Sequence, residues 1–334
     1  MGWFQINHFQ CNLKNIFLYQ INNVTLHKQI NNKHMNEINY EQTVKNIRQL
    51  LKDYIIKQNL KSLVIGVSGG IDSALVCALA KPVVDELGIP LIGRSISIES
   101  NKEDEKERAR NIGQYFCTDF KEIDLTEHYY VLKDVDALEG GSEEDTAYRI
   151  RMGNIKARMR MIYLYNLAHK SSGMVLGTEN ICEHYLGFCT RGGDEISDFE
   201  PIKGLWKNEV YDMTEYLANI SNIYEKTALL ACIECNATDG LGISNTDLDQ
   251  ILPDWRNRHN TTRTGYGEVD RLFIEYFKLI DKINKTANAI EKNELMQLVN
   301  IMKESPVIQR YLKTDYKRSG PYVISRENII FLDK

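Results

Sequence analysis

The sequence lacks several features that would assign it to a particular class of protein. No apolar run in its 334 residues reaches the length of a membrane-spanning helix. The opening MGWFQI lacks the basic region and apolar core of an export signal, and Ile6 does not fit the myristoylation pattern. Basic residues are not in excess, because the net charge is -5 at pH 7. We therefore expect a cytoplasmic protein with neither a membrane nor a nucleic-acid partner.

The cysteines form no recognisable metal or disulfide framework. Seven are scattered along the chain, an odd number for a protein without an export signal, so we expect free thiols. Cys232 and Cys235 make one CxxC pair, but no second pair stands at zinc-ribbon spacing, and metal or redox work there is not favoured. Cys77 lies on an apolar helix face and is predicted to be a core residue.

What is present is enough apolar sequence for a folded core. With 43% hydrophobic and 26% charged residues, the chain can form one large or two smaller globular domains. Residues 1–38 are rich in Asn and Gln with little periodicity, and we interpret them as a poorly structured appendage. Residues 39–334 are interpreted as one domain.

Within that domain, predicted strands alternate with predicted helices. The alternation is typical of an α/β fold with a doubly wound, mostly parallel sheet flanked by helices. Residues 252–265 are a polar, arginine-containing loop without an assignable element. Apolar runs predict strands at 63–67, 90–97 and 174–176, and helical spacing predicts helices at 40–59, 74–87, 103–116, 146–169 and 207–218.

The stretch SLVIGVSGGIDSALV, residues 62–76, places a polar turn between a buried strand and a helix. Such a turn lies at the carboxyl edge of a parallel sheet, where a helix N-terminus offers unpaired N–H groups to an anion. Gly69 and Gly70 allow close backbone approach, Ser68 and Ser73 can donate hydroxyl hydrogen bonds, and Asp72 is a suitable magnesium ligand. The turn lacks the lysine of a G-x-x-x-x-G-K-[ST] loop, so a different phosphate pose is predicted.

SGGIDS resembles the pyrophosphate-binding loop of the ATP pyrophosphatases, the PP-loop family of adenine nucleotide alpha hydrolase-like fold. Those enzymes cleave ATP to AMP and pyrophosphate while adenylating a substrate oxygen. Three further stretches resemble the central motifs of one branch, the ammonia-dependent NAD synthetases, in order and spacing. They are GNIKARMRMIYLYNLA (153–168), MVLGTEN followed by Glu183, and GFCTRGGDEISDFEPIKGLWKNEV (187–210). The resemblance covers roughly residues 40–325, apart from the 252–265 loop.

The resemblance assigns nucleotide and metal roles to particular residues. Asp72 and Glu183 are implied to be magnesium ligands, and with Lys207 and Asp194 they form the implied catalytic set. The implied ATP contacts are Gly66, Val67, Ser68, Gly69, Gly70, Ile71, Asp72, Ser73, Arg94, Thr178, Lys207 and Thr238.

A second set of implied contacts concerns the acid substrate. Arg151, Asn154 and Arg158 are spaced for one helix face, opposite a stripe containing Met159 and Ile162. From the pattern alone, Arg151 and the nearby Lys156 and Arg160 are expected on a solvated basic face. Arg191 stands where the family usually has lysine, and Tyr316 where it usually has histidine. The implied substrate contacts are Arg158, Arg191, Asp198, Tyr316 and Lys317.

The chemistry implied is the amidation of nicotinic acid adenine dinucleotide (deamido-NAD) to NAD. A carboxylate oxygen attacks the α-phosphorus of ATP, pyrophosphate leaves, and ammonia then displaces AMP from the acyl-adenylate. The proton of ammonium passes to Asp194, Asp198 or bulk water, and the sequence does not decide among them. Only 67 residues precede Ser68, too few for an amidase domain of typical size, so ammonia is expected as nitrogen donor unless a separate amidase subunit supplies it. The family also implies a homodimer.

Two other classes stay open at this point. An ATP pyrophosphatase acting on RNA, or another amide-forming member, would share the loop, although the acidic balance and the single CxxC argue against an RNA substrate. A nucleotide-binding regulator without catalysis would lack a magnesium acid or the phosphate lysine, whereas Asp72, Glu183 and Lys207 are all present.

Overall fold

Four parallel strands form the centre of the fold in the order β3-β2-β1-β4. In the computed structural model, residues 38–99, 102–136, 139–236 and 246–319 are described. The chain builds outward from β1 to β3 and then crosses to the other edge for β4, so the carboxyl ends of β1 and β4 flank a topological switch point. This confirms the predicted doubly wound sheet. The strands are β1 (Ser62–Gly66), β2 (Leu91–Ser97), β3 (Asp119–Asp124) and β4 (Gly173–Val175).

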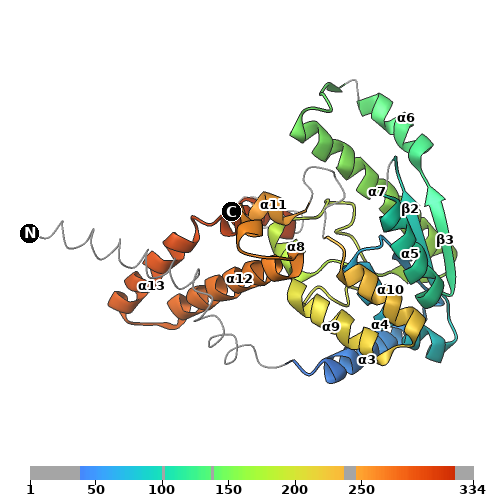
Figure 1. Ribbon diagram of the computed structural model, residues 1–334, viewed down its shortest axis with the longest axis horizontal. Coiled ribbons are helices and arrows are strands. Elements are labelled where there is room, and N and C mark those ends of the chain that lie inside the picture. Colours follow the sequence, from blue (N-terminus) through green and yellow to red (C-terminus); the bar gives the residue numbers. More distant parts are fainter. Residues whose placement is uncertain (1–37, 100–101, 137–138, 237–245, 320–334) are drawn as a thin grey trace, which may run out of the picture.

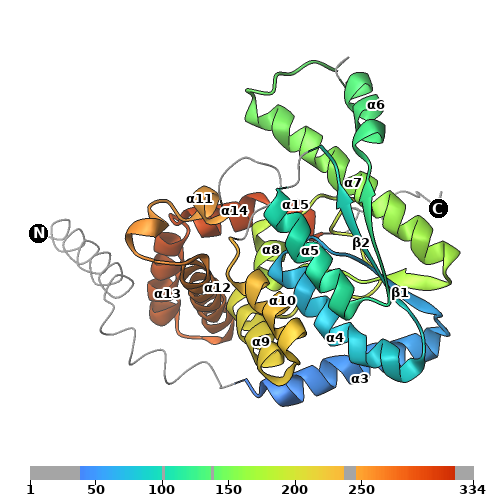
Figure 2. The same ribbon diagram turned by 45° about the vertical axis from the view of Figure 1, so that its right-hand side comes forward.

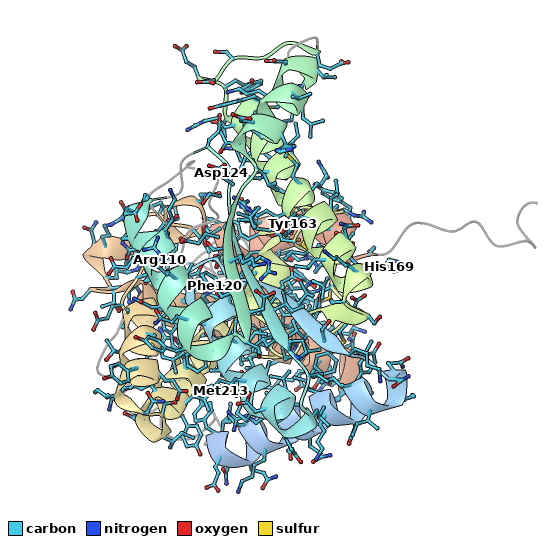
Figure 3. The ribbon with its side chains drawn as sticks, turned by 90° about the vertical axis from the view of Figure 1, so that its right-hand side faces the viewer. Arg110, Phe120, Asp124, Tyr163, His169 and Met213 are labelled. Carbon is cyan, nitrogen blue, oxygen red and sulfur yellow. The ribbon has the colours of Figure 1, made fainter. Side chains whose placement is uncertain are left out.

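Helices cover both faces of the sheet, because neighbouring residues of a strand point to opposite faces. Leu63 and Ile65 of β1 pack in one cluster, and Val64 packs in another. Figure 3 shows α5, with Arg110, and α7, with Tyr163 and His169, on opposite sides of the strands. The first layer is α3 (Tyr40–Gln58), α4 (Ile71–Leu87), α5 (Glu103–Phe116), α9 (Lys207–Ile220) and α10 (Ile223–Ile233), and the second is α6 (Thr126–Asp136) and α7 (Thr146–Lys170).

A separate group of helices lies beside the sheet and has its own aromatic core (Figure 1). Tyr185 contacts Phe273, Phe277 and Tyr311 with ring centroids 5.0 to 5.7 Å apart. This group packs on the sheet domain through α12 and α9. It comprises α8 (Ile181–Leu186), α11 (Leu248–Ile251), α12 (Thr262–Lys285), α13 (Ala289–Met302), α14 (Pro306–Lys313) and α15 (Asp315–Arg318).

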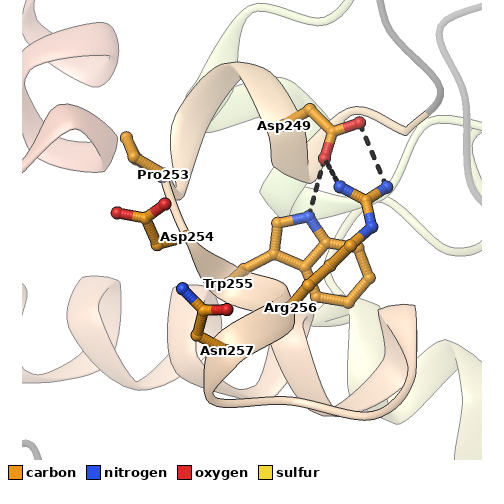
Figure 4. A pocket seen from close by; sticks show the side chains of 6 residues that line it. All are labelled: Asp249, Pro253, Asp254, Trp255, Arg256 and Asn257. Atoms are coloured by element: carbon orange, nitrogen blue, oxygen red, sulfur yellow. Dashed lines mark hydrogen bonds and ion pairs between the residues drawn. The ribbon is translucent and has the colours of Figure 1, made fainter.

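The 252–265 segment is more ordered than its polar composition predicted (Figure 4). It contains a 3₁₀ turn, Trp255–Asn257, and the last residues already belong to α12. Trp255 is buried, and its indole N–H donates to Asp249 at 2.8 Å. Asp249 also pairs with Arg256, whose guanidinium lies over the indole ring. The expectation of a structureless loop was therefore wrong, and these residues line a small pocket of about 230 Å³.

Other expectations can be compared with the described residues. The six cysteines among them are free, and Cys77 is buried in the core as predicted. Ile162 was expected on the packed face of α7 but is 71% exposed, so that prediction was wrong. No described helix combines the length and apolar character needed to cross a membrane. Residues 1–37 of the expected appendage lie outside the described residues.

Candidate active site

The loop between β1 and α4 is held by its own serine hydroxyls. The Ser73 hydroxyl donates to the Gly70 carbonyl at 3.1 Å and lies 3.1 Å from the Ser68 hydroxyl, which accepts from Gly70 N–H at 3.2 Å. Ser73 is buried at the base of the loop, and these bonds of its hydroxyl stabilise the loop. The N–H groups of the first turn of α4 stay available to an anion, as at any helix start.

Gly69 is required by its backbone conformation and by a neighbouring helix. Its φ is +82°, and a Cβ at this position would lie 2.3 Å from the carbonyl oxygen of Glu105 in α5. In the same place, Arg108 of α5 donates from Nε to the Gly69 carbonyl at 3.0 Å. Packing against α5 therefore fixes the loop from outside, which the sequence pattern did not indicate.

Three charged side chains meet beside this loop. The Lys207 ammonium, at the start of α9, lies 2.5 Å from Asp72 Oδ2 of α4 and 3.0 Å from Glu183 Oε1 of α8. Lys207 is only 1% exposed, so the two carboxylates are its immediate electrostatic environment. The structure thus brings together the two implied magnesium acids and the implied phosphate lysine, which are separated by up to 135 residues.

Asp72 and Glu183 share a single ammonium. Burial, and then the negative charge of Asp72, raise the pKa of Glu183 to about 8. Burial by itself would lower the pKa of Lys207, but the charges of Asp72 and Glu183 hold that pKa well above its ordinary value. While Glu183 keeps its proton, Asp72 and Lys207 balance each other, and a further cation is needed only when Glu183 is ionised.

Asn180 connects the two acids and was not identified from the sequence. Its side-chain amide donates to Asp72 Oδ1 at 2.8 Å, and its oxygen caps α8 by accepting from Glu183 N–H at 3.1 Å. Glu183 in turn accepts from Asn180 N–H at 3.3 Å, which completes a capping box. The signal was present in the sequence as Asn-x-x-Glu, because this spacing marks a helix start.

Asp72, Glu183 and Lys207 line a cavity of about 890 Å³ at the carboxyl ends of β1 and β4, between the sheet and the neighbouring helices. Two basic residues of α7 also line it, Lys156, paired with Glu99, and Arg160, which donates to the Ile96 carbonyl. A solvated basic face was expected for these two, and that expectation was wrong. Of the predicted residues, the cavity lining includes residues 66–73, Arg94, Thr178, Glu183, Asp194, Lys207, Tyr316 and Lys317.

Of the predicted substrate residues, three contact one another, and two are bonded to backbone groups elsewhere. Arg158 and Arg191 lie outside the cavity lining but are joined to it at what we call the rim: Arg158 Nε donates to the Arg191 carbonyl at 3.1 Å, and Arg191 donates at 2.9 Å to the carbonyl of Tyr316, which lines the cavity. Three segments far apart in sequence therefore meet. Lys317 donates to two carbonyls that follow α8, and Asp198 lies outside the cavity lining, where its carboxylate accepts from Val175 N–H at 2.8 Å.

Three further residues were predicted from the sequence, namely Arg94, Asp194 and Thr238. Arg94 is buried and pairs with Asp119 at 2.8 Å, so its charge is already partnered inside the protein. Asp194 lines the cavity and accepts from Thr190 N–H at 2.8 Å. Thr238 lies outside the described residues.

The donor set near the loop fits the magnesium ion that the sequence resemblance implies. No group of three or more metal-binding side chains occurs among the residues that the structure describes. Asp72 and Glu183, however, point at one position, now taken by the Lys207 ammonium. Two carboxylates completed by phosphate oxygens and water are typical of Mg²⁺.

Sequence comparisons connect this geometry with known proteins. A family model described as NAD synthase matches residues 43–269. The chain is 32% identical over 225 residues to the NH(3)-dependent NAD(+) synthetase of Finegoldia magna, with 67% of this chain and 88% of that protein covered. It is 35% identical over 228 residues to the protein of the same name from Pyrococcus furiosus, with 66% and 80% covered.

Solved structures show the same fold. The NMN synthetase from Francisella tularensis superposes with a TM-score of 0.61 at 21% identity, covering 86% of this chain and 99% of that chain. The NH3-dependent NAD synthetase from Campylobacter jejuni, in complex with the nitrate ion, gives 0.58 at 22%, covering 86% and 100%. At such identities the likeness concerns the fold alone.

Proposed function

The chain belongs to the NAD synthase family, and we propose that it amidates deamido-NAD to NAD with ATP and ammonia, releasing AMP and pyrophosphate. The observation that carries the proposal is the meeting of Asp72, Glu183 and Lys207 beside the anion-binding loop, in a cavity at the switch point of the sheet. The curated relatives named above are ammonia-dependent NAD synthetases, so the RNA-modifying and regulatory alternatives are not favoured.

The residues of the cavity divide the work of the first step. The N–H groups at the start of α4 bind the phosphates, and Lys207 balances the charge that develops on the leaving pyrophosphate. Asp72 and Glu183 would hold Mg²⁺, which supplies further charge neutralisation when bound. The acid substrate enters from the rim formed by Arg158, Arg191 and Tyr316, which positions its carboxylate for attack on the α-phosphorus.

The second step requires neutral ammonia. Both acids accept one backbone N–H, but Asp194 lines the cavity and Asp198 does not, so we propose that Asp194 accepts the proton of ammonium. Ammonia then attacks the acyl carbon, and AMP leaves with the bonding electron pair. The cytoplasmic location expected from the sequence stays a prediction.

Assay of the purified chain with deamido-NAD, ATP and magnesium tests the proposed function. We expect NAD formation with ammonium chloride and none with glutamine, and a rate that rises with pH as the unprotonated fraction of ammonium grows. Nicotinic acid mononucleotide is the comparison substrate, because the related fold from F. tularensis is an NMN synthetase. Efficient glutamine-driven synthesis without an ammonia route, or amidation of the mononucleotide alone, would contradict the proposal.

Arg158→Ala is expected to raise the KM for deamido-NAD about tenfold, which corresponds to about 1.4 kcal/mol, and to leave the KM for ATP within about a factor of two. The reason is position, because Arg158 lies at the rim beside Arg191 and away from the loop. Arg151→Ala is the matched control, since Arg151 is on the same helix but pairs with Asp136 of α6 and not with the Arg191 segment. Equal effects on both substrates would remove Arg158 from the acid site.

We further propose that the protein is a homodimer joined through α6 and α7; α6 and the beginning of α7 project from the body of the molecule (Figure 2). Monomeric proteins seldom expose a contiguous apolar patch without a partner for it. The exposed apolar residues on these helices are Tyr130, Val131, Leu132, Val135, Ile150 and Ile162.

Sedimentation of the wild-type chain should therefore give the mass of a dimer, and Val131→Lys combined with Val135→Lys should give a monomer. Ile290→Lys is the control, because Ile290 is 74% exposed on α13, away from these helices. A fully active wild-type monomer would exclude the dimer as the working form.

A further inference from the structure

In the helix that supplies Lys207, Glu209 accepts the Trp206 N–H at 2.8 Å, but the N-cap residue itself offers no acceptor to the N–H groups of the first turn. This N-cap residue, Trp206, has no side-chain oxygen that could accept an N–H of the first turn. Side chains of two other helices, Cys182 of α8 and Asp270 of α12, cap these N–H groups instead. Lys207 N–H donates to the Cys182 sulfur at 3.3 Å, and Asn208 N–H donates to Asp270 Oδ2 at 3.0 Å.

Cys182 and Asp270 are themselves joined. The thiol donates to Asp270 Oδ1 at 2.7 Å, and the two residues are 88 positions apart in sequence. Both are buried, with 0% and 5% exposure, so water cannot replace a lost bond. One hydrogen-bonded unit therefore touches α8, α9 and α12 at a single point.

The start of α9 is fixed to α12 by its side chains as well. With its amide oriented to satisfy both partners, Asn208 donates to the Arg263 carbonyl at 3.0 Å and accepts from Gly267 N–H at 3.1 Å. The negative charge of Asp270 also lies at the positive end of the α9 dipole, where it is stabilising. The first turn of α9 is thus fixed in translation and in rotation.

These contacts bear directly on two residues of the proposed site, Lys207 and Glu183. Cys182 directly precedes Glu183 on α8, and the N–H that Cys182 accepts is that of Lys207 itself. The Lys207 side chain is 1% exposed and packed along its length, so the position of its backbone decides where its ammonium lies. A displacement of about 1 Å is enough to reduce catalysis on the order of 100-fold.

We propose that Cys182 and Asp270 form a positioning pair that sets Lys207 and Glu183 at their distances from the phosphate loop. The inference rests on the proposed function for what Lys207 does, and neither residue touches substrate. The pair positions the residues proposed to contact magnesium and the phosphates of ATP. Its loss should therefore lower kcat and the affinity for Mg·ATP, and it should leave binding of deamido-NAD unchanged.

Four variants test the pair. Asp270→Asn keeps an oxygen for Asn208 N–H but turns a donor toward the thiol, and Cys182→Ala removes the sulfur. We expect each to lower kcat on the order of 10- to 100-fold, to weaken Mg·ATP binding in calorimetry, and to leave the KM for the acid within about a factor of two. Cys182→Ser, which can donate and accept in the same way, should recover most of the activity. The Cys182→Ala, Asp270→Asn double variant should be no worse than the poorer single one, because one unit is lost in each case.

Cys77→Ala is the matched control, because Cys77 is equally buried but belongs to the apolar core around α4 and is not one of the groups that bond the first turn of α9. It should lower thermal stability without changing kcat. The proposal is overturned if Asp270→Asn and Cys182→Ala keep wild-type kcat, if their effects multiply in the double variant, or if both substrates are affected equally. Calorimetry of Mg·ATP needs no turnover, so it judges the pair even when the wild-type chain makes no NAD, an outcome that would refute only the proposed function.

Discussion

Lys207→Met is expected to reduce the rate of NAD formation about 1,000-fold, the range found when one group that stabilises developing charge is removed. The ammonium lies between Asp72 and Glu183 and is almost completely buried, so no other charge on α9 can take its place. Its removal also leaves two carboxylates facing each other, which should lower the free energy of unfolding by about 3 kcal/mol.

Two measurements separate these effects. The rate is taken at a temperature where circular dichroism shows the variant folded, and the unfolding free energy comes from denaturant titration. Lys81→Met is the control, since Lys81 forms an ion pair with Asp85 at the surface of α4. A folded Lys207→Met protein with more than about a tenth of the wild-type rate would exclude the assigned role.

Asp72→Asn and Glu183→Gln are each expected to lower turnover by a factor on the order of 100 or more and to raise the magnesium concentration needed for half the maximal rate. Both changes keep the shape of the side chain and remove its charge. The fold should survive, because the two residues lie in the first turns of α4 and α8, facing the cavity, and not in a packed core.

The matched control is Asp85→Asn, on the same helix as Asp72 but at its far end and half exposed. It should leave both the rate and the magnesium response unchanged. A variant of Asp72 or Glu183 that turns over normally, with the same magnesium dependence as wild type, would show that the residue is not a ligand.

Several elements could be predicted from the sequence because their signals are local. The helix 103–116 was predicted with its observed ends, and the strands at 62–66 and 91–97 within about one residue, since apolar runs and helical spacing are set by neighbours along the chain. β3 was missed because it is an edge strand whose residues Lys121, Glu122 and Asp124 are exposed, which removes the apolar run. The 252–265 segment was misjudged because burial of Trp255 depends on Asp249 and α12, not on its polar neighbours.

The sequence by itself determined the chemistry of this protein, because a strand, a glycine turn and a helix start form an anion site from contiguous residues. Only the tertiary structure decided how the remaining groups meet it. Lys207 reaches Asp72 across 135 positions, and Asp270 reaches Cys182 across 88. Such pairs arise from the packing of α8, α9 and α12 against one another, and one sequence without this packing carries no trace of which buried polar groups satisfy each other.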